Sequence, residues 1–485
     1  MQIKLYNTLS KQIENFNALD DKDVKIYSCG PTVYNYAHIG NMRAFLFADF
    51  LQRVIRTVGG FQVKWVMNIT NIDDKTIRDS RIGSQVWLPE MGNQSEDILQ
   101  NLLTLTEFYE KSFIQDIAAL GVNSNHFYKM PRATDYINQM QKLILKIINK
   151  RTAYISQGSI YFDLSEYRKT ETYGKLFNID FGNFIEGSRI DSDQYERENI
   201  SDFVLWKSKR EDEPYWDFEI DGQNYPGRPG WHIECSAMEF DILGLPFDIH
   251  TGGVDLRFPH HEDEIAQSKA GYGIEPTVFW CHNEFLEVEG EKMSKSKGNF
   301  FTLRDLIDQG FDPLDIRFSI LSTHYGSIYN FTNSGIKASA KARARVQEFI
   351  YSIFDTADNS EVQPDIQKLK NDVFGALADD LHSPKALAKL FGFINEYSGK
   401  AIDELSKDSL KEFFTELNEV FNVWEISPRV EIEIKIPSKI IDIAEKRLIV
   451  RANKDFAESD NLRKILDDLG YIIKDSKDSY TIIKK

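Results

Sequence analysis

The sequence predicts an α/β protein whose first domain has a parallel sheet, and three observations lead to this class. A β-favouring run at 24–27 is followed by a Gly-Pro turn and by a segment, 42–55, whose apolar residues recur at helical spacing. A Gly59-Gly60 turn then leads into a second apolar run at 61–67. Strands that alternate with helices form parallel sheets, and such sheets bind ligands at the carboxyl ends of their strands.

Composition sets broad limits on the class of protein. A chain of 485 residues is too long for one core, and its 42% hydrophobic content is sufficient for two or more domains. Three cysteines cannot form a disulfide framework, and we find neither an apolar signal segment nor a run long enough to span a bilayer, so we expect a soluble, cytoplasmic protein with reduced thiols. The formal net charge of −17 argues against a protein that coats nucleic acid, although a local basic face remains compatible with it.

The turn after the first strand carries the first candidate functional residues. Cys-Gly-Pro-Thr-Val-Tyr (29–34) leads into His-Ile-Gly-Asn (38–41), where the helix begins. The first turn of a helix exposes unpaired N–H groups and a partial positive charge, so the glycine and His38 at this place suit a phosphate. Taken alone, the segment is equally well explained as an ordinary α/β corner.

A second motif lies far downstream, Glu-Lys-Met-Ser-Lys-Ser-Lys-Gly-Asn (291–299). Alone, it is explained as a solvated basic loop. The two motifs in this order, both beside strand-to-helix patterns, resemble the paired signatures of class I aminoacyl-tRNA synthetases. Three further motifs, together with residues 29–34, narrow the resemblance to the cysteinyl-tRNA synthetase family: Asn-Ile-Thr-Asn-Ile-Asp-Asp-Lys (68–75), Gly-Trp-His-Ile-Glu-Cys-Ser-Ala-Met (230–238) and Phe-Pro-His-His-Glu-Asp-Glu-Ile-Ala-Gln-Ser (258–268). The resemblance covers nearly the whole chain and is weakest in residues 76–150 and 340–430.

The resemblance implies a fold and a domain order: a Rossmann-type class I synthetase catalytic domain with an insertion, then a helical bundle and a small anticodon-binding domain. The expected segments are a first catalytic half (1–121), a connective insertion (122–217), a second catalytic half (218–285), the Lys-Met-Ser-Lys-Ser loop with a stem-contact region (286–337), the bundle (338–427) and the anticodon-binding domain (428–485). Local patterns predict helix over 76–120 and a helix that begins with Ser383 as its N-cap.

Four residues are candidate metal ligands: Cys29, Cys235, His260 and Glu264. Their types suit zinc, but their spacing does not resemble a zinc finger, and buried structural cysteines are the alternative. Pro259 before helix-forming residues predicts a helix that places His260 and Glu264 one turn apart on one face. His261 pairs with Glu264 equally well; only the resemblance selects His260, and it implies one zinc ion per chain.

The sequence also excludes some zinc enzymes and gives the metal a different task. The stretch 258–268 has no His-Glu-x-x-His and the chain has no Cys-x-x-Cys, which counts against a metalloprotease or a nucleobase deaminase. With four protein ligands the expected role is selection: a metal lowers the pKa of a substrate thiol from about 8.5, which serine cannot match. Such a bond removes the need for an editing site, and we find no further catalytic constellation in the insertion.

The resemblance assigns roles around this metal. The residues expected to contact the substrate cysteine are Gly30, Thr70, Trp231, His250 and Asp255, although Thr70 is also explained as a helix cap. Catalysis is assigned to His38, Asn41, Lys292 and Lys295, of which Lys295, together with Gly40, is expected to bind ATP with its Mg²⁺. The sequence departs from the family pattern at Thr251, Glu284 and Lys297.

The last segment, 428–485, differs electrically from the rest, with 13 Lys and Arg against 11 Asp and Glu. By resemblance, Arg451, Asp460 and Asp475 fall on positions that read anticodon bases. Phe456 replaces a tryptophan there and is suited to stacking on a base. A surface salt-bridge pattern and a core phenylalanine are the alternatives.

Three hypotheses about function follow. The first is a monomeric cysteine–tRNA ligase that takes L-cysteine, ATP and tRNA(Cys) and has no membrane partner. The second is a ligase that uses the same adenylate to acylate a small amino sugar and lacks the anticodon-reading end. The third is a zinc-stabilised tRNA-binding protein without chemistry, against which the intact His38 and Lys295 argue.

Overall fold

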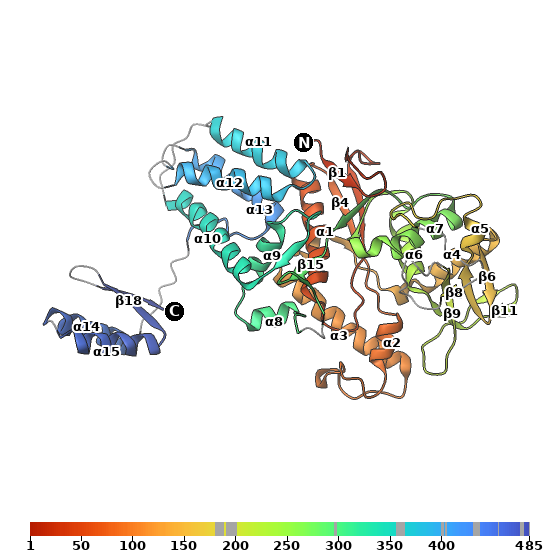
Figure 1. Cartoon of the computed structure of the whole chain (residues 1–485), viewed down its shortest axis with the longest axis horizontal. Helices are drawn as coiled ribbons and strands as arrows, with labels where there is room; N and C mark the ends of the chain where they lie inside the picture. The colour runs from red at the N-terminus through yellow and green to blue at the C-terminus, as the bar shows by residue number, and fades with distance from the viewer. Residues whose placement is uncertain are drawn as a thin grey trace. The chain divides into compact units, whose positions relative to one another are not determined.

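The computed structural model describes ten segments of the chain (Figure 1): 1–179, 189–190, 201–294, 298–355, 364–398, 402, 405–429, 437–453, 455–475 and 480–484. The chain divides into two compact units, residues 1–427 and 428–485. Each unit has its own hydrophobic core. Within the described segments no helix combines the length and apolar character that crossing a membrane requires.

A five-stranded parallel sheet lies at the centre of the first unit, in the order β14-β13-β3-β4-β5. Its strands are β3 Asp23–Ser28, β4 Gln62–Met67, β5 Phe127–Lys129, β13 Phe247–Gly253 and β14 Thr277–Asn283. The register pairs Val24 with Val63 and Ile26 with Ile249. Every residue of β13 is buried, as expected for a parallel strand covered on both faces. The predicted parallel α/β class is confirmed.

Helix α1, Ile39–Thr57, is the central helix of this unit (Figure 1). The sequence predicted it over 42–55, and the structure starts it three residues earlier, because His38 is the N-cap and its side chain accepts a hydrogen bond from the Asn41 N–H. The helix contacts β3, β4, β13 and β14 as well as α9 (Pro313–Leu321) and α13 (Lys407–Phe421). It therefore joins the sheet to the helices that follow it in the chain.

Three buried charged residues stabilise the packing of α1 against α9 and α13. The Asp49 carboxylate lies 2.8 Å from Arg53 and 2.6 Å from Arg317, and Arg317 also donates to the carbonyl oxygens of Phe421 and Leu120. Burial raises the pKa of Asp49, but the two guanidinium groups outweigh burial and hold that pKa well below its ordinary value. The charged carboxylate is thus part of the native packing.

We expect Asp49→Asn to lower the free energy of unfolding of this unit by roughly 3–5 kcal/mol, since it leaves two guanidinium groups buried without their anion. The folded pKa lies below the unfolded value of about 3.9, so the stabilisation is complete above that value and is lost as the pH falls below it. Urea unfolding followed by circular dichroism should therefore show a deficit at pH 7 that shrinks below about pH 4.

The control for this prediction is an exposed pair of the same type, Lys111 and Glu107, whose charged atoms lie 2.9 Å apart. Lys111→Met should change the unfolding free energy by less than about 1 kcal/mol, because exposed ion pairs contribute little. Equal effects of the two substitutions at pH 7 would contradict the role given to Asp49.

The insertion forms a second sheet, in the order β12-β9-β7-β6 with β8 beside β9. Its strands are β6 Ala153–Ser156, β7 Ser159–Phe162, β8 Arg189–Ile190, β9 Asp202–Ser208 and β12 Gly227–Pro229. Helices α4 (Ile137–Asn149) and α5 (Leu164–Tyr167) and the hairpin of β10 (Glu219–Ile220) and β11 (Gln223–Asn224) complete this region.

The pairing of strands moves two boundaries that we expected from the sequence. Residues 127–129, assigned to the insertion, pair with β4 in the central sheet, and residues 227–229, assigned to the second catalytic half, pair with β9 in the insertion. Both strands have only three residues, too short for a periodicity to be recognised. Their place is decided by partners distant in sequence.

The helix predicted over 76–120 is interrupted. Helix α2 covers Asp74–Ser80 and α3 covers Ile98–Ala119, while the residues between them contain only the short 3₁₀ helix Pro89–Met91. Gly83 and Gly92 adopt φ angles of 84° and 77° in this connection, which an α-helix cannot accommodate. The prediction was wrong for residues 81–97.

Four long helices form the bundle: α10 Asn333–Asp355, α11 Pro364–Ala378, α12 Ser383–Tyr397 and α13. We expected Ser383 to be the N-cap of α12, but the structure gives this position to His382, whose ring accepts from the Lys385 N–H. Ser383 is instead the first residue of the helix. One face of the helix is apolar and buried, at Leu387, Leu390 and Ile394.

The remaining elements of the first unit flank these layers. They are the hairpin β1 Lys4–Asn7 and β2 Gln12–Asn15, the helices α6 Trp231–Leu243, α7 His260–Tyr272 and α8 Leu303–Asp308, and the small sheet of β15 Leu286–Val288, β16 Glu291–Lys292 and β17 Tyr329–Phe331. Cys281 is fully buried in β14.

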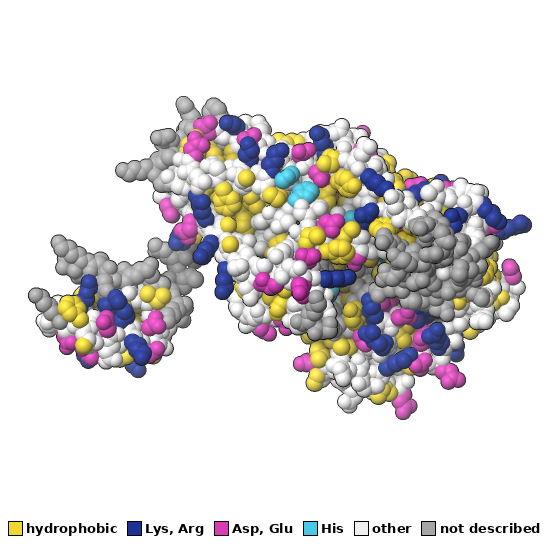
Figure 2. Space-filling model, in the orientation of Figure 1, with side chains coloured by type: hydrophobic (Ala, Val, Ile, Leu, Met, Phe, Trp, Pro, Cys, Tyr) yellow, Lys and Arg dark blue, Asp and Glu magenta, His cyan; other side chains and the backbone are white. Residues whose placement is uncertain are grey.

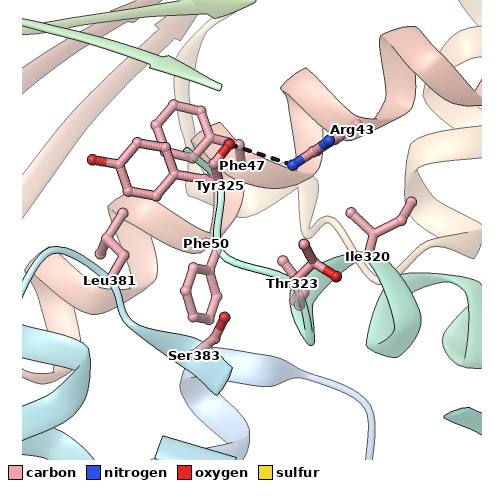
Figure 3. Close-up of a pocket in the computed structure, with 9 residues that line it drawn as sticks. Arg43, Phe47, Phe50, Ile320, Thr323, Tyr325, Leu381 and Ser383 are labelled. Carbon is pink, nitrogen blue, oxygen red and sulfur yellow. Dashed lines mark hydrogen bonds between the residues drawn. The ribbon is translucent and has the colours of Figure 1, made fainter. Parts of the chain in front are cut away.

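A small cavity lies between α1, the end of α9 and the start of α12 (Figure 3). Tyr325 stacks on Phe47 there with ring centroids 4.6 Å apart, and Arg43 donates to backbone carbonyl groups, including that of Tyr325. The volume of about 20 Å³ holds no more than a single water molecule. We interpret it as a packing gap and not as a ligand site.

The second unit consists of α14 Ser438–Ala452 and α15 Phe456–Asp468 beside the antiparallel hairpin of β18 Tyr471–Asp475 and β19 Tyr480–Lys484. Its small core contains Ile440, Ala444, Leu466, Tyr471 and Ile473. The acidic and basic side chains on its surface are interspersed (Figure 2).

Candidate metal and nucleotide site

The structure brings together the four predicted metal ligands from three separate elements. Cys29 follows the carboxyl end of β3, Cys235 lies on α6, and His260 and Glu264 lie one turn apart on α7, as predicted. Pro259 is the N-cap of α7, so the sequence signal for this helix start was correct. All four residues converge at the end of the central sheet.

The separations of the donor atoms fit one tetrahedral zinc ion. The two Sγ atoms lie 4.0 Å apart, Cys235 Sγ lies 3.6 Å from His260 Nε2, and Cys29 Sγ lies 3.7 Å from Glu264 Oε1. His260 Nε2 and Glu264 Oε1 are closer, at 2.9 Å. Ligand bonds of about 2.0–2.3 Å place tetrahedral ligand atoms about 3.3–3.8 Å apart, so the set needs only small adjustments.

Two of the four ligands, Glu264 and Cys235, favour the anionic form, whereas burial and Cys235 raise the pKa of the Cys29 thiol, and Glu264 and Cys235, against burial, raise the pKa of the His260 imidazole. Burial raises the pKa of Glu264, but the imidazoles of His250 and His260 outweigh burial and hold it well below its ordinary value. Burial likewise raises the pKa of Cys235, yet Cys29 and His260 lower it to about 6. The Glu264 Oε2 atom makes no hydrogen bond within the described segments, although His250 Nε2 lies 2.8 Å away. A carboxylate and a thiolate thus face each other in a buried space.

A second group of four donors overlaps the first and consists of Cys29, His250, His261 and Glu264. His261 Nε2 lies 3.3 Å from Cys29 Sγ, and its Nδ1 lies 2.8 Å from His282 Nε2. His250 Nε2 is also 2.9 Å from Glu239. The geometry alone therefore allows either histidine of α7 as a ligand, which is the alternative that the sequence left open.

The residues expected to contact cysteine lie around this group. The Gly30 N–H donates to Asn68 Oδ1 at 2.9 Å, and a Cβ at Gly30 would lie 1.7 Å from the Asn68 carbonyl oxygen, so no other residue fits there. The buried Thr70 hydroxyl donates to Glu234 Oε2 at 3.1 Å. It does not cap a helix, because Asp73 caps α2.

The other three residues expected to contact the substrate cysteine lie on different elements. Trp231 is the first residue of α6, and its ring stacks on His260 with centroids 4.1 Å apart. His250 is fully buried in β13, whereas Asp255 is exposed on the 3₁₀ helix Val254–Arg257. Thr251, one departure from the family pattern, bonds Ser28 through the two hydroxyl groups at 2.7 Å, so it reinforces the contact between β13 and β3.

The described residues expected to act in catalysis or to bind ATP lie at the start of α1 and on β16. His38 caps α1, with Gly40 and Asn41 in its first turn, and Lys292 is exposed at the end of β16. Gly40 approaches the loop, because a Cβ there would lie 3.0 Å from Met293 Cε. Lys295 lies outside the described residues, as does Lys297, which departs from the family pattern. Glu284, another departure from that pattern, follows β14.

The residues expected to read the anticodon lie in the second unit. Arg451 is in the last turn of α14, Phe456 begins α15 with 63% of its surface exposed, and Asp460 is exposed on α15. The exposure of Phe456 excludes the alternative of a core residue. Asp475 ends β18, and its side chain lies outside the description.

Two buried carboxylates of α6 were not predicted from the sequence. Glu234 accepts a hydrogen bond from the Thr70 hydroxyl, and Glu239 lies beside His250. Burial and the neighbouring Glu264 raise the pKa of Glu239 to about 8. Cys235 and Glu239 are one turn apart, so the i, i+4 spacing was a usable signal.

Solved structures share this fold at low sequence identity. The chain aligns with methionyl-tRNA synthetase of Mycobacterium tuberculosis in complex with methionyl-adenylate at a TM-score of 0.58 and 13% identity, over 83% of this chain and 92% of that one. For the leucyl-tRNA synthetase of Agrobacterium radiobacter K84 in a ternary complex, the TM-score is 0.56 at 11% identity, over 84% and 85%. Residues 15–341 match the model of the class I tRNA synthetase (C) catalytic domain. The parallel sheet with its two signature motifs is therefore that of a class I aminoacyl-tRNA synthetase.

Relatives along the whole chain narrow this class. The cysteine–tRNA ligase of Leptospira interrogans serovar Lai is 41% identical, with 100% of both chains covered. The enzyme of the same name from Brachyspira hyodysenteriae is 39% identical over 98% of each chain. This chain belongs to the cysteine–tRNA ligase family.

Proposed function

We propose that this cysteine–tRNA ligase selects its amino acid through a zinc ion held by Cys29, Cys235, His260 and Glu264. The observation that carries the proposal is the convergence of these four donor atoms, all within 4.8 Å of one another, at the end of the central sheet. A bound zinc would hold the substrate sulfur as a thiolate and so distinguish cysteine from serine. We expect one zinc ion per chain.

The neighbouring residues would position the rest of the amino acid. Trp231 packs against His260 and closes one side of the site, while Thr70 and Gly30 line the ends of β4 and β3. His250 and Asp255 complete the set that we assign to cysteine. Because discrimination rests on a bond that serine cannot make, this site has no need of a separate editing reaction.

The chemistry requires alignment more than covalent assistance from the protein. The cysteine carboxylate attacks the α-phosphorus of ATP, and pyrophosphate leaves. We assign the triphosphate to His38 and the N–H groups of the first turn of α1, which carries a partial positive charge. Lys292 and Lys295 would stabilise the negative charge that develops on the pyrophosphate, together with Mg²⁺.

Transfer to tRNA needs a surface for the acceptor stem near the site and a second surface, distant from it, that recognises the anticodon. Basic and acidic side chains are mixed around α2 on the face shown in Figure 2, where the exposed Arg78 and Arg81 pair with Asp79 and Asp212. We therefore assign the acceptor stem of tRNA(Cys) to the segment 286–337, as the family resemblance implies. The anticodon is assigned to Arg451, Phe456, Asp460 and Asp475 in the unit 428–485. We expect a cytoplasmic monomer.

Cysteine-dependent pyrophosphate exchange tests adenylate formation, and truncation after Ser427 tests recognition of the tRNA. The truncated protein retains the whole first unit, so it should keep the exchange rate within about twofold. Its kcat/KM for tRNA should fall by at least roughly tenfold, the equivalent of one lost base contact.

Arg451→Ala in the full chain should reproduce part of that loss, with Lys446→Ala, an exposed position on the same helix, as the matched control. Unchanged tRNA charging by the truncated protein would refute the anticodon assignment. Acylation of an amino sugar without charging of tRNA would instead favour the second hypothesis.

A further inference from the structure

The segment that follows the Lys-Met-Ser-Lys-Ser motif lies directly against the start of α1. Thr302 pairs with His38 in an antiparallel bridge, and the Ile39 N–H donates to the Phe301 carbonyl oxygen at 3.0 Å. Thr302 also caps α8 in a capping box with Asp305, which fixes its backbone. The two signature motifs are thus joined by backbone hydrogen bonding through residues 300–302.

The His38 ring is held from two sides. A Cβ on Gly40 would lie 2.9 Å from both Cε1 and Nδ1 of His38, so the ring lies across the first turn of α1. Phe300 contacts the ring edge to face, with centroids 5.2 Å apart and planes at 67°. Such aromatic pairs have a preferred geometry, so Phe300 restricts the rotation of the imidazole.

The hydrogen bond at Nδ1 decides the tautomer. His38 Nδ1 accepts from the Asn41 N–H at 3.3 Å. In a neutral imidazole the other nitrogen then carries the proton, so Nε2–H is the donor that the ring offers. A histidine fixed in this way can donate to a phosphate oxygen without being protonated at neutral pH, provided that the ring keeps its orientation.

Arg304 fastens this segment to the rest of the unit. Its guanidinium lies over the Tyr36 ring at 4.7 Å and 3.1 Å from the Asp116 carboxylate. It also donates to Gln115 Oε1 at 3.2 Å. Asp116 and Gln115 belong to α3, and Tyr36 lies two residues before His38, so Arg304 fixes the turn of the first motif and the strand-like segment 300–302 together.

We propose that Phe300 is a positioning residue for catalysis: it orients the His38 imidazole so that Nε2–H faces the triphosphate of ATP, and Arg304 anchors the segment that carries it. The proposal rests on the function assigned to His38 above. Phe300 has no group that can donate or accept a proton, and the Arg304 guanidinium is engaged by Asp116, Gln115 and Tyr36, so both residues act through His38.

The first test measures cysteine-dependent pyrophosphate exchange by Phe300→Leu in the full-length, zinc-loaded protein. The kcat should fall about three- to tenfold, which corresponds to the interaction energy of one aromatic pair, and the KM for cysteine should be unchanged. Phe300→Tyr should restore most of the rate, because the ring edge is retained. Phe391→Leu, at a half-buried phenylalanine of α12, is the matched control and should leave the rate unaltered.

A double-mutant cycle separates positioning from a general structural effect. In a His38→Asn background Phe300→Leu should lower kcat by less than twofold, since the ring that it orients is absent. Arg304→Met should likewise lower kcat when His38 is present and by less than twofold in the His38→Asn background. If Phe300→Leu lowers kcat by the same factor with and without His38, or lowers it in neither case, the proposal is wrong.

Failure of the proposed function has a different signature. If the unmodified protein shows no cysteine-dependent exchange, the assignment of His38 fails before Phe300 is tested. The proposal requires that the variants and the unmodified protein have the same zinc content and the same thermal unfolding midpoint. If the rate of Phe300→Leu falls only in proportion to a loss of folded protein, the proposal is wrong.

Discussion

Cys235→Ala should lower the bound zinc from one ion per chain to nearly none and should raise the relative use of serine by at least two orders of magnitude. Cys235 belongs to only one of the two overlapping donor groups, because the other uses His250 and His261 with Cys29 and Glu264. Three-ligand sites bind zinc more weakly, and a pocket without the metal distinguishes a thiol from a hydroxyl by no more than about a hundredfold. Metal analysis by mass spectrometry after gel filtration, followed by pyrophosphate exchange with cysteine and with serine, measures both effects.

His261→Asn is the matched variant, since it changes the second donor group alone. It should retain zinc, as Cys281→Ala should, because Cys281 is buried in the core away from both groups. If His261→Asn loses the metal while Cys235→Ala keeps it, the second group is the zinc site. Full zinc content together with unaltered rejection of serine in Cys235→Ala would refute selection by the metal.

Lys295→Ala should lower kcat for adenylate formation by about 10²–10³, the loss typical of one electrostatic contact to developing charge. The charge on the pyrophosphate grows towards the transition state, so the KM for cysteine should change little. Single-turnover measurement of adenylate formation, with the KM for cysteine and for ATP determined separately, checks this division.

Lys337→Ala, at an exposed lysine of α10, provides the control for the removal of one positive charge and should change kcat by less than twofold. Lys292→Ala should lower kcat less than Lys295→Ala does if Lys295 is the principal contact. A Lys295→Ala enzyme with normal kcat and a raised KM for cysteine would assign Lys295 to amino-acid binding instead.

The sequence by itself determined the class of fold and the candidate residues of the site, because both rest on local patterns. The strand-turn-helix pattern before His38 predicted β3 and α1, and Pro259 predicted the helix that brings His260 and Glu264 onto one face. These features depend on side-chain periodicity and helix capping within a few residues. The family resemblance added the pairing of distant motifs.

Only the tertiary structure decided which distant residues meet. The three-residue strand β5 joins the central sheet and β12 joins the insertion through partners that no local pattern reveals. Residues 81–97 were included in the helix that local patterns predicted over 76–120, but Gly83 and Gly92 with positive φ interrupt it.

The same distinction holds within the site. Glu234 and Glu239 become part of it because residues 232–239 of α6 are all buried, and Phe300 becomes part of it because a backbone bridge brings Thr302 to His38. Local propensity acts over a helical turn, whereas burial and pairing act between segments hundreds of residues apart. The candidate ligands could therefore be named from the sequence, while the contacts that surround them could not.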